Sequence, residues 1–310
     1  MKTEQEHFRG CLLGLACGDA VGTAVEFQPR GFFLPVTDMI GGGPFCLKPG
    51  EWTDDTSMAL CLGSSLVERQ SFDPLDQMQK YCQWWNEGYL SSTGECFDIG
   101  STICHALRKF KITGDPFSGS TDPMSAGNGC IMRLAPVPMF FYPDQKAIIH
   151  FSGESSRTTH GTEECIDACR LFGSMIYKAL SGKSKEDILF GEYFPFNEDI
   201  QLSENIQEIA EGIYKDKNES DIKGSGYVVK SFEAALWCFQ KTDNFKDAIL
   251  KAVNLGDDAD TTGAVCGQIA GAFYGESGIP QKWRNRLAKY EVISNLADKL
   301  YESTVNNNCT

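Results

Sequence analysis

Residues 7–27, near the N-terminus, combine two features that limit the fold this chain can adopt. Large apolar residues such as Phe8, Leu12 and Leu15 recur at the spacing of one helical face, while small residues occupy another face. A face of small residues allows two helices to pack closely. Similar helical patterns recur at residues 54–69, 97–110, 161–180, 227–240 and 254–275. Because few alternating, strand-like segments compete with them, the sequence predicts a compact all-α architecture.

The length and the distribution of charge along the chain predict its domain organisation. The chain has 310 residues, and we expect a single domain over residues 1–310. Residues 181–226 are charged and weakly periodic, which predicts a helical insertion with mobile ends. Helical patterns resume on both sides of this segment, so we do not interpret it as a linker. The polar tail, residues 305–310, is expected to fray.

Net charge and cysteine content limit the cellular setting. The formal net charge of -14 argues against broad binding to nucleic acid or anionic membranes, since both attract basic surfaces. No uninterrupted apolar run approaches the roughly 20 residues that span a bilayer, and the N-terminus lacks a secretory apolar segment. The 13 cysteines are scattered without a CxxC pair, which is typical of buried thiols in a reducing compartment; zinc sites and a catalytic thiol are the alternatives. We therefore expect a cytoplasmic protein without membrane contact or extended nucleic-acid binding.

Two short acidic clusters directly precede apolar helical patterns. Their members are Thr53, Asp54 and Asp55 in the first, and Asp257, Asp258, Asp260 and Thr261 in the second. Acidic residues at helix starts are common because they cap the helix and complement its dipole. If the two helices pack together, however, several carboxylates meet at low dielectric, where their repulsion requires neutralising cations. From the residues alone we expect a metal-dependent hydrolase acting on a phosphorylated ligand, or a calcium-stabilised structural protein as the alternative.

The clusters belong to a longer series of motifs between residues 10 and 275. In order, these are GLACGDAVGTAVEF, GEWTDDTSMAL, CFDIGSTICHAL, GNGCIMRLAPV, the pair Thr159 and His160, and GDDADTTGAVCGQIAGAFYG. The series resembles the ADP-ribosylglycohydrolase family, whose founding type is the dinitrogenase reductase-activating glycohydrolase. The resemblance implies a compact all-α fold with two divalent cations, Mg²⁺ or Mn²⁺. It also implies cleavage of the bond between the ribose of ADP-ribose and an acceptor.

The resemblance assigns metal ligation to both clusters. The implied ligands are Thr53, Asp54, Asp55, Asp258, Asp260 and Thr261. Asp257 stands where many members of the family have glycine. We therefore expect Asp257 to be solvated or to cap a helix, and not to bind metal.

Two further carboxylates match acidic positions of the family near the scissile bond. Glu26 falls at the glutamate near the metals, and Asp98 falls at the acidic residue beside the substrate ribose. Either residue is a candidate acid/base. Ser101 stands where the nitrogenase-regulating type has asparagine, and it is a candidate substrate contact.

The remaining candidate substrate contacts lie in three loops. Gly127, Asn128 and Gly129 form a loop that could cradle the diphosphate, with a tight turn as the alternative. His160 matches a family histidine near the phosphates and ribose, with a structural or capping role as the alternative. Tyr227 follows flexible glycines and could stack on adenine or ribose, or it could anchor a helix.

The resemblance thus predicts a metal-dependent ADP-ribosyl hydrolase that acts on an ADP-ribosylated protein and releases ADP-ribose. Arginine is favoured over serine as the acceptor by similarity to the bacterial type. One alternative is hydrolysis of an ADP-ribosylated small molecule or nucleic-acid end. Another is a non-catalytic relative that binds ADP-ribose or is structural, and the complete ligand clusters argue against it.

Overall fold

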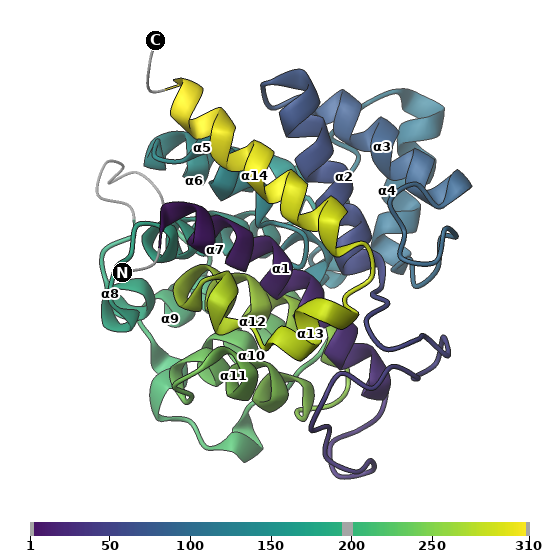
Figure 1. The fold of residues 1–310 in the computed structure, drawn as a ribbon. Coiled ribbons are helices and arrows are strands. Elements are labelled where there is room, and N and C mark those ends of the chain that lie inside the picture. Colours follow the sequence, from purple (N-terminus) through teal and green to yellow (C-terminus); the bar gives the residue numbers. More distant parts are fainter. Residues whose placement is uncertain (1–2, 194–200, 308–310) are drawn as a thin grey trace.

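The computed structural model describes residues 3–193 and 201–307 (Figure 1). These residues form α-helices and short 3₁₀-helices; the described part of the chain has no β-strand and only isolated bridges between loops. The α-helices are α1 (Glu4–Gly22), α2 (Asp54–Arg69), α3 (Pro74–Glu87), α4 (Ser101–Thr113), α5 (Pro136–Phe141), α6 (Gln145–Arg157), α7 (Glu163–Leu180), α8 (Lys185–Phe190), α9 (Glu204–Ala210), α10 (Val228–Gln240), α11 (Phe245–Val253), α12 (Ala259–Tyr274), α13 (Gln281–Arg286) and α14 (Tyr290–Asn307). The 3₁₀-helices are η1 (Thr23–Val25), η2 (Pro123–Ser125), η3 (Asn128–Cys130), η4 (Ile213–Asp216), η5 (Glu219–Asp221) and η6 (Glu276–Gly278). The predicted all-α architecture is confirmed.

Helices α1 and α12 pack against each other at the centre of the fold, running antiparallel (Figure 1). A Cβ atom on Gly14 would lie 2.3 Å from the carbonyl oxygen of Gly267, and one on Gly18 would lie 2.0 Å from that of Gly263. Only glycine can occupy these positions, because any side chain would overlap the facing backbone. The small face predicted for residues 7–27 is therefore a backbone-to-backbone contact. It brings the C-terminal end of α1 beside the N-terminal end of α12.

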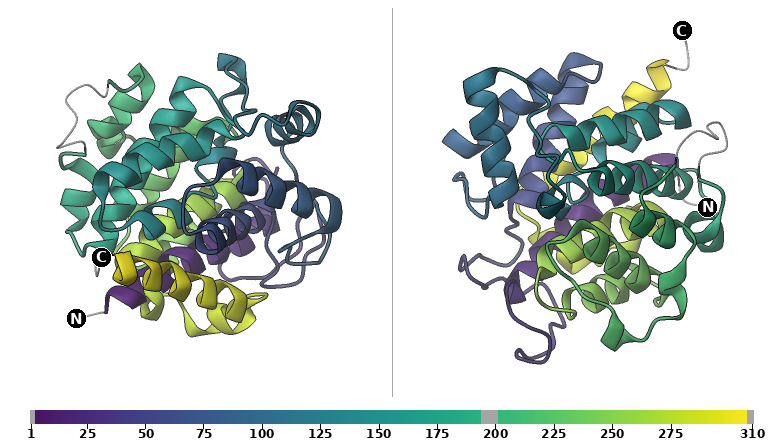
Figure 2. Two further views of the ribbon diagram at one scale, coloured as in Figure 1. Left: turned by 90° about the horizontal axis from the view of Figure 1, so that it is seen from above. Right: turned by 180° about the vertical axis from the view of Figure 1, so that it is seen from behind.

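The other helices surround this central pair. Figure 2 shows α2, α3 and α4 together at one corner of the molecule, away from α10 and α11. Their buried apolar side chains belong to one continuous cluster that includes α1 and α12. The segment Glu4–Val25 is long and apolar enough to cross a membrane by length and composition, but 89% of its apolar 18-residue window is buried inside the fold. A core helix has this property.

The charged segment between residues 181 and 226 contains short helices. They are α8, α9, η4 and η5, and residues 194–200 of the segment lie outside the described residues. Ile188, Ile206 and Tyr214 of this segment are buried in the common apolar cluster. At the C-terminus α14 continues to Asn307, and residues 308–310 of the predicted frayed tail lie outside the described residues.

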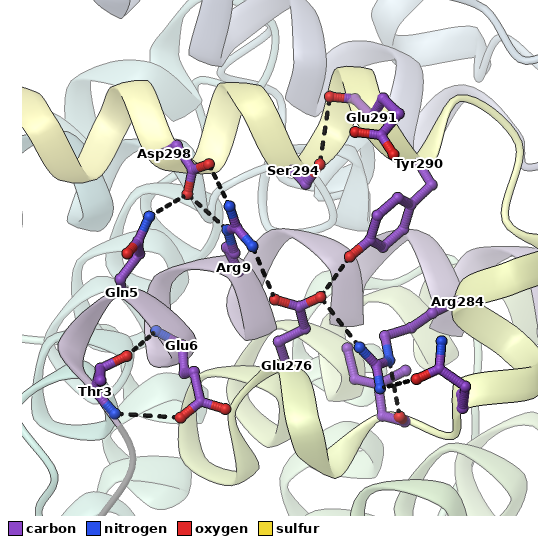
Figure 3. A network of polar contacts seen from close by, with 12 residues as sticks. Thr3, Gln5, Glu6, Arg9, Glu276, Arg284, Tyr290, Glu291, Ser294 and Asp298 are labelled. Carbon is purple, nitrogen blue, oxygen red and sulfur yellow. Dashed lines mark hydrogen bonds and ion pairs between the residues drawn. The ribbon is translucent and has the colours of Figure 1, made fainter.

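A network of charged side chains fastens α14 to α1 (Figure 3). Arg9 donates hydrogen bonds to both carboxylate oxygens of Asp298 at 2.7 and 2.6 Å, and a weaker one to Glu276 at 3.4 Å. Arg284 donates to the second oxygen of Glu276 at 3.2 Å, and the Tyr290 hydroxyl donates to the same oxygen. The hydrogen bond from Arg9 lowers the pKa of Asp298. Within this network, guanidinium groups of the chain itself neutralise the carboxylates.

Candidate functional site

A cavity of about 350 Å³ opens where the N-terminal ends of α2, α4 and α12 meet the segment that follows α1. Its acidic lining residues are Glu26, Asp54, Asp98, Asp258 and Asp260. None of the described residues that line it is a lysine or an arginine. A cavity with five carboxylates and no cationic side chain of its own attracts cations strongly.

The two acidic clusters predicted from the sequence meet at this cavity. Of the six predicted metal ligands, Asp54, Asp258, Asp260 and Thr261 line it, while Thr53 and Asp55 are buried outside its lining. The clusters also contact each other: Thr261 Oγ1 donates to Asp55 Oδ1 at 3.3 Å, and Thr53 Oγ1 lies 3.2 Å from Asp260 Oδ2. The structure therefore brings the two predicted clusters together.

Helix capping does not explain these clusters. Thr53 and Asp258 occupy the N-cap positions of α2 and α12, but neither side chain makes a capping hydrogen bond. Elsewhere the chain uses such caps: Asp73, Asp144 and Thr162 cap α3, α6 and α7 with their side chains. The side chains at the start of α2 and α12 are therefore not used as helix caps.

Asp19, which the sequence analysis did not single out, fixes the start of α2. It is fully buried in α1 and accepts hydrogen bonds from the backbone N–H and the hydroxyl of Thr53, at 2.9 and 3.0 Å. It also accepts from the N–H and the hydroxyl of Thr56, at 3.1 and 2.6 Å. Burial raises the pKa of Asp19 to about 6 in spite of these hydrogen bonds. A lone acid among the small and apolar residues of α1 is the sequence signal for this role.

The carboxylates of the site suit divalent cations. Burial, and then repulsion between neighbouring carboxylates, raises the pKa of Asp54, Asp55 and Asp260 well above the usual range. Among the described residues, Glu26 Oε2, Asp55 Oδ2 and Asp260 Oδ1 are buried without a hydrogen-bond partner. One carboxylate oxygen each from Glu26, Asp98 and Asp260 lie within 4.8 Å of one another. Hard divalent cations bind such oxygens and remove the cost of leaving them unpaired.

Glu26 and Asp98 lie in the same cavity but differ in proton affinity. Burial, followed by the charge of Asp260, raises the pKa of Glu26 to about 11. Burial, followed by the charge of Asp19, raises the pKa of Asp98 to about 7. Asp98 also has a left-handed backbone, with φ of 61°, and follows Phe97, whose ring packs against Phe45. Two carboxyl groups with separated pKa values are the usual basis of acid/base chemistry.

The loop of residues 127–129 lines the cavity, but two of its amides are already bonded. The N–H of Gly127 donates to the carbonyl of Ser125 at 2.8 Å, and the N–H of Asn128 donates to that of Gly226 at 3.0 Å. The predicted diphosphate cradle therefore cannot use these two groups in this conformation. The Asn128 side chain instead donates to Asp258 Oδ2 at 2.7 Å and so orients a carboxylate of the site.

His160 lies against this loop and also lines the cavity. A Cβ atom on Gly129 would lie 2.8 Å from His160 Cε1, so the glycine makes room for the imidazole ring. Burial lowers the pKa of His160 to about 4, which leaves the ring neutral at pH 7. Arg133 donates to Thr159 Oγ1 at 2.6 Å, and that hydroxyl lies 2.8 Å from His160 Nδ1. Because Thr159 Oγ1 accepts from Arg133, its own hydrogen can be donated to Nδ1, and the ring then carries its proton on Nε2.

The first turn of α4 also faces the cavity. Ser101, Thr102 and Ile103 line it, and α4 begins at Ser101. No acceptor among the described residues is paired with the backbone N–H groups of these three residues. Free N–H groups at a helix N-terminus bind anions such as phosphate. The sequence pointed to Ser101 as a substrate contact but not to the backbone N–H groups of this helix end.

Tyr227 lies beside the cavity and not in its lining. It lines a neighbouring hollow of about 610 Å³, which shares Thr102, Gly127 and Gly226 with the main cavity. Its hydroxyl donates to the carboxylate of Glu164 at 2.7 Å. The ring is therefore held by its hydroxyl at the edge of a second, adjoining space.

Asp257 differs from the other acidic residues of its cluster. Its side chain is exposed, and the N-cap of α12 is Asp258, so Asp257 is solvated and does not cap the helix. Its φ of 56° lies in the left-handed region. This conformation favours glycine, which is the residue expected at this position from the resemblance.

Comparison with known proteins identifies the family. Residues 1–309 match the family described as ADP-ribosylglycohydrolase. The chain belongs to the ADP-ribosylglycohydrolase family. It is 44% identical over 293 residues to the ADP-ribosylarginine hydrolase Tri1 of Serratia proteamaculans, covering 94% of this chain and 78% of that protein. It is 31% identical to the ADP-ribosyl-[dinitrogen reductase] glycohydrolase of Rhodospirillum rubrum, covering 90% of this chain and 89% of that protein.

A solved structure supports the same assignment. It is described as an ADP-ribosylglycohydrolase-related protein complex and matches this fold with a TM-score of 0.87 at 39% identity. The match covers 98% of this chain and 100% of that chain. The predicted family, its all-α fold and the expectation of a glycosidic-bond hydrolase are confirmed. The family is metal-dependent, in agreement with the acidic cluster of the cavity.

Proposed function

We propose that this ADP-ribosylglycohydrolase cleaves the N-glycosidic bond between ADP-ribose and an arginine side chain of a protein, and so releases ADP-ribose. The observation that carries the proposal is the cavity lined by five carboxylates and, among its described residues, by no lysine or arginine. Such a cavity suits divalent cations and a guanidinium group. The arginine acceptor is further supported by 44% identity to the ADP-ribosylarginine hydrolases Tri1 of Serratia proteamaculans and Pseudomonas putida.

We place two divalent cations, Mg²⁺ or Mn²⁺, between the two acidic clusters. The residues that would hold them are Thr53, Asp54, Asp55, Asp258, Asp260 and Thr261. The unpartnered buried oxygens of Asp55 and Asp260 support this placement. When bound, such cations lower the pKa of a water molecule and bind substrate hydroxyls. Asp19 contributes by holding Thr53 and the first turn of α2 in place.

We assign the acid/base role to Asp98. Its pKa, raised to about 7, allows it to hold and to release a proton near neutral pH, which suits protonation of the departing guanidine nitrogen. Glu26 belongs to the same group of carboxylates, and its ionised form would stabilise positive charge that develops at ribose C1 during cleavage. Replacing Asp98 by Asn should therefore lower kcat more than it weakens ADP-ribose binding.

We place the ADP-ribose moiety along the N-terminal end of α4 and His160. The unpaired N–H groups of Ser101, Thr102 and Ile103 support diphosphate binding there. His160, neutral with its proton on Nε2, adds a donor to the same cavity. The adjoining hollow at Tyr227 has room for the adenine or its ribose.

The test is release of ADP-ribose from peptides that carry it on arginine, serine or cysteine. Each is incubated with Mg²⁺ or Mn²⁺, and in parallel with a chelator, using Asp260→Asn as the matched inactive control. We expect chelator-sensitive release from the arginine-linked peptide. Release only from another linkage would replace the proposed acceptor. Absence of release from all three, with ADP-ribose still bound in calorimetry, would contradict hydrolysis of protein-linked ADP-ribose.

We also propose a cytoplasmic setting without membrane contact or extended nucleic-acid binding. The twelve cysteines in the described part of the chain are all free thiols, in keeping with a reducing compartment. The net charge of -14 supports the expectation that nucleic acid is not a general partner.

A further inference from the structure

Phe27, next to Glu26 in the chain, has two features that do not contribute to the stability of the fold. It is one of the residues that line the cavity, yet 65% of its surface is exposed. Its backbone has a φ of 61°, in the left-handed region that bulky side chains rarely adopt. An exposed aromatic ring in a strained backbone gains little from packing. Strain of this kind gathers at sites that contact ligands.

The segment that leads into α12 holds Phe27 in this conformation. The N–H of Phe27 donates to the carbonyl of Asp257 at 2.7 Å, and the N–H of Asp257 donates to the carbonyl of Gln28 at 2.8 Å. One residue further on, Pro29 and Gly256 form an isolated antiparallel bridge. The ring is therefore presented from a fixed backbone and not from a free loop tip.

The surroundings of this ring favour a guanidinium group. Glu26 precedes it, and Asp98 and Asp258 line the same cavity. An aromatic face attracts a cation, and arginine stacks on such faces better than lysine. We infer that the ring of Phe27 is the surface on which the guanidinium of the ADP-ribosylated arginine stacks, so that Phe27 contributes to acceptor specificity. This inference rests on the proposed function.

Adenine also stacks on aromatic rings, but its place in the substrate argues against Phe27 as its partner. In ADP-ribose a ribose and a diphosphate separate adenine from the ribose whose bond is cleaved. Phe27 directly follows Glu26, and its N–H is bonded to the residue that precedes Asp258. Glu26 and Asp258 are two of the carboxylates that surround the reacting group in our proposal. The ring thus lies on the side of the acceptor.

The test compares Phe27→Leu, Phe27→Trp and Phe27→Gly with the wild type on an ADP-ribosylated arginine peptide. Phe32→Leu is the matched control, because Phe32 is 83% exposed on the same loop and does not line the cavity. Phe27→Leu, which keeps the apolar bulk but loses the aromatic face, should lose about tenfold in kcat/KM, mainly through KM. Phe27→Trp should stay within about threefold of the wild type, and Phe32→Leu should not change activity. Inhibition by free agmatine, a guanidinium product analogue, should weaken in parallel with the loss in Phe27→Leu.

The outcomes separate the alternatives. ADP-ribose affinity, measured by calorimetry, should be the same in Phe27→Leu and the wild type. A parallel loss of ADP-ribose affinity would assign the ring to adenine and overturn the inference. Full activity of Phe27→Leu and Phe27→Gly would overturn it as well, and Phe27→Gly, which relieves the strain, guards against a folding artefact. Wild-type protein without activity on arginine-linked ADP-ribose would instead refute the proposed function, and the inference with it.

Discussion

Two groups of acidic side chains in this protein differ in how their negative charge is balanced. In the network that joins α14 to α1, Asp298 and Glu276 are paired with Arg9 and Arg284, and the hydrogen bond from Arg9 lowers the pKa of Asp298 (Figure 3). In the cavity, burial and mutual repulsion raise the pKa of carboxylates such as Asp260, and the described lining contains no lysine or arginine. The first group is neutralised by the chain itself. The second requires cations from solution, or protons, to balance its charge.

The largest expected effect follows from removing one carboxylate of the cavity. Asp260→Asn should lower kcat/KM by at least about 10³-fold, because loss of metal-assisted charge stabilisation is worth several kcal/mol and each 1.4 kcal/mol is about tenfold. In chelator the same variant should unfold at a higher temperature than the wild type, because it removes a buried carboxyl group whose charge is disfavoured by burial and by neighbouring carboxylates. Steady-state kinetics and thermal unfolding with and without chelator measure both effects.

Activity and metal-free stability, measured together, distinguish a metal ligand from a structural residue. A structural Asp260 would lower both activity and metal-free stability when it is replaced. Retention of full activity by the folded variant, checked by circular dichroism, would contradict the metal centre as we have placed it.

A second prediction concerns the dependence of metal binding on pH. Burial raises the pKa of Asp98 to about 7 and of Glu26 to about 11, so the metal-free folded state binds more protons than the unfolded state above about pH 4. Stability of the metal-free protein should therefore fall as the pH rises from about 5 to 8. Divalent cations bind the deprotonated ligands and should offset this loss, by about 2.7 kcal/mol at 100 times Kd.

Thermal unfolding with Mg²⁺ or Mn²⁺, compared with chelator, measures this effect at pH 5.5 and pH 8. The stabilisation by metal should be larger at pH 8. Asp260→Asn should reduce the stabilisation, whereas Asp298→Asn, in the network paired with arginine, should leave it unchanged. Equal stabilisation of the wild type at both pH values would show that the raised carboxylate pKa values are not coupled to metal binding.

The third prediction concerns the network in which arginines neutralise the carboxylates. Glu276→Gln leaves Arg9 and Arg284 without their shared carboxylate, and it should lower the free energy of unfolding by about 1–2 kcal/mol. The arginines are partly exposed, which limits the cost. Chemical denaturation measures the loss. Because the network lies outside the cavity lining, kcat/KM should not change, and a drop in activity at full folding would connect the two regions.

The sequence predicted the helices of this fold better than the positions of their ends. The pattern at residues 54–69 has the same bounds as α2, because a continuous apolar face marks the whole helix. The pattern at residues 97–110 begins too early. α4 starts only at Ser101, since Asp98 has a left-handed backbone and interrupts the helical path. Local backbone conformation of this kind is set by tertiary contacts and is not marked by the apolar periodicity.

The candidate site shows the same limit. Its acidic clusters were predictable because several carboxylates beside apolar helices are costly without a partner. The free backbone N–H groups at the start of α4 were not predictable, because nearly every residue type has a backbone N–H group. The backbone N–H of Asn128 donates to the carbonyl of Gly226, which is far away in the sequence. Only the fold therefore shows that this N–H is not free to bind an anion. Asp19 was detectable as an acid among the small and apolar residues of the second half of α1, but its partners Thr53 and Thr56 required the packing of α2 against α1.

The smallest expected effect separates the buried carboxylates from their solvated neighbour. Asp257 lies next to Asp258 but is exposed, and it contributes backbone hydrogen bonds that glycine would keep. Asp257→Gly relieves its left-handed conformation but adds freedom to the unfolded chain, so the free energy of unfolding should change by less than about 1 kcal/mol. Asp257→Asn, which removes only the charge, is the matched control, and both variants should keep kcat/KM within about twofold of the wild type. A loss comparable to that of Asp260→Asn would mean that the carboxylate of Asp257 takes part in the metal centre, and proximity in the chain, not burial, would then decide which acids of the cluster bind cations.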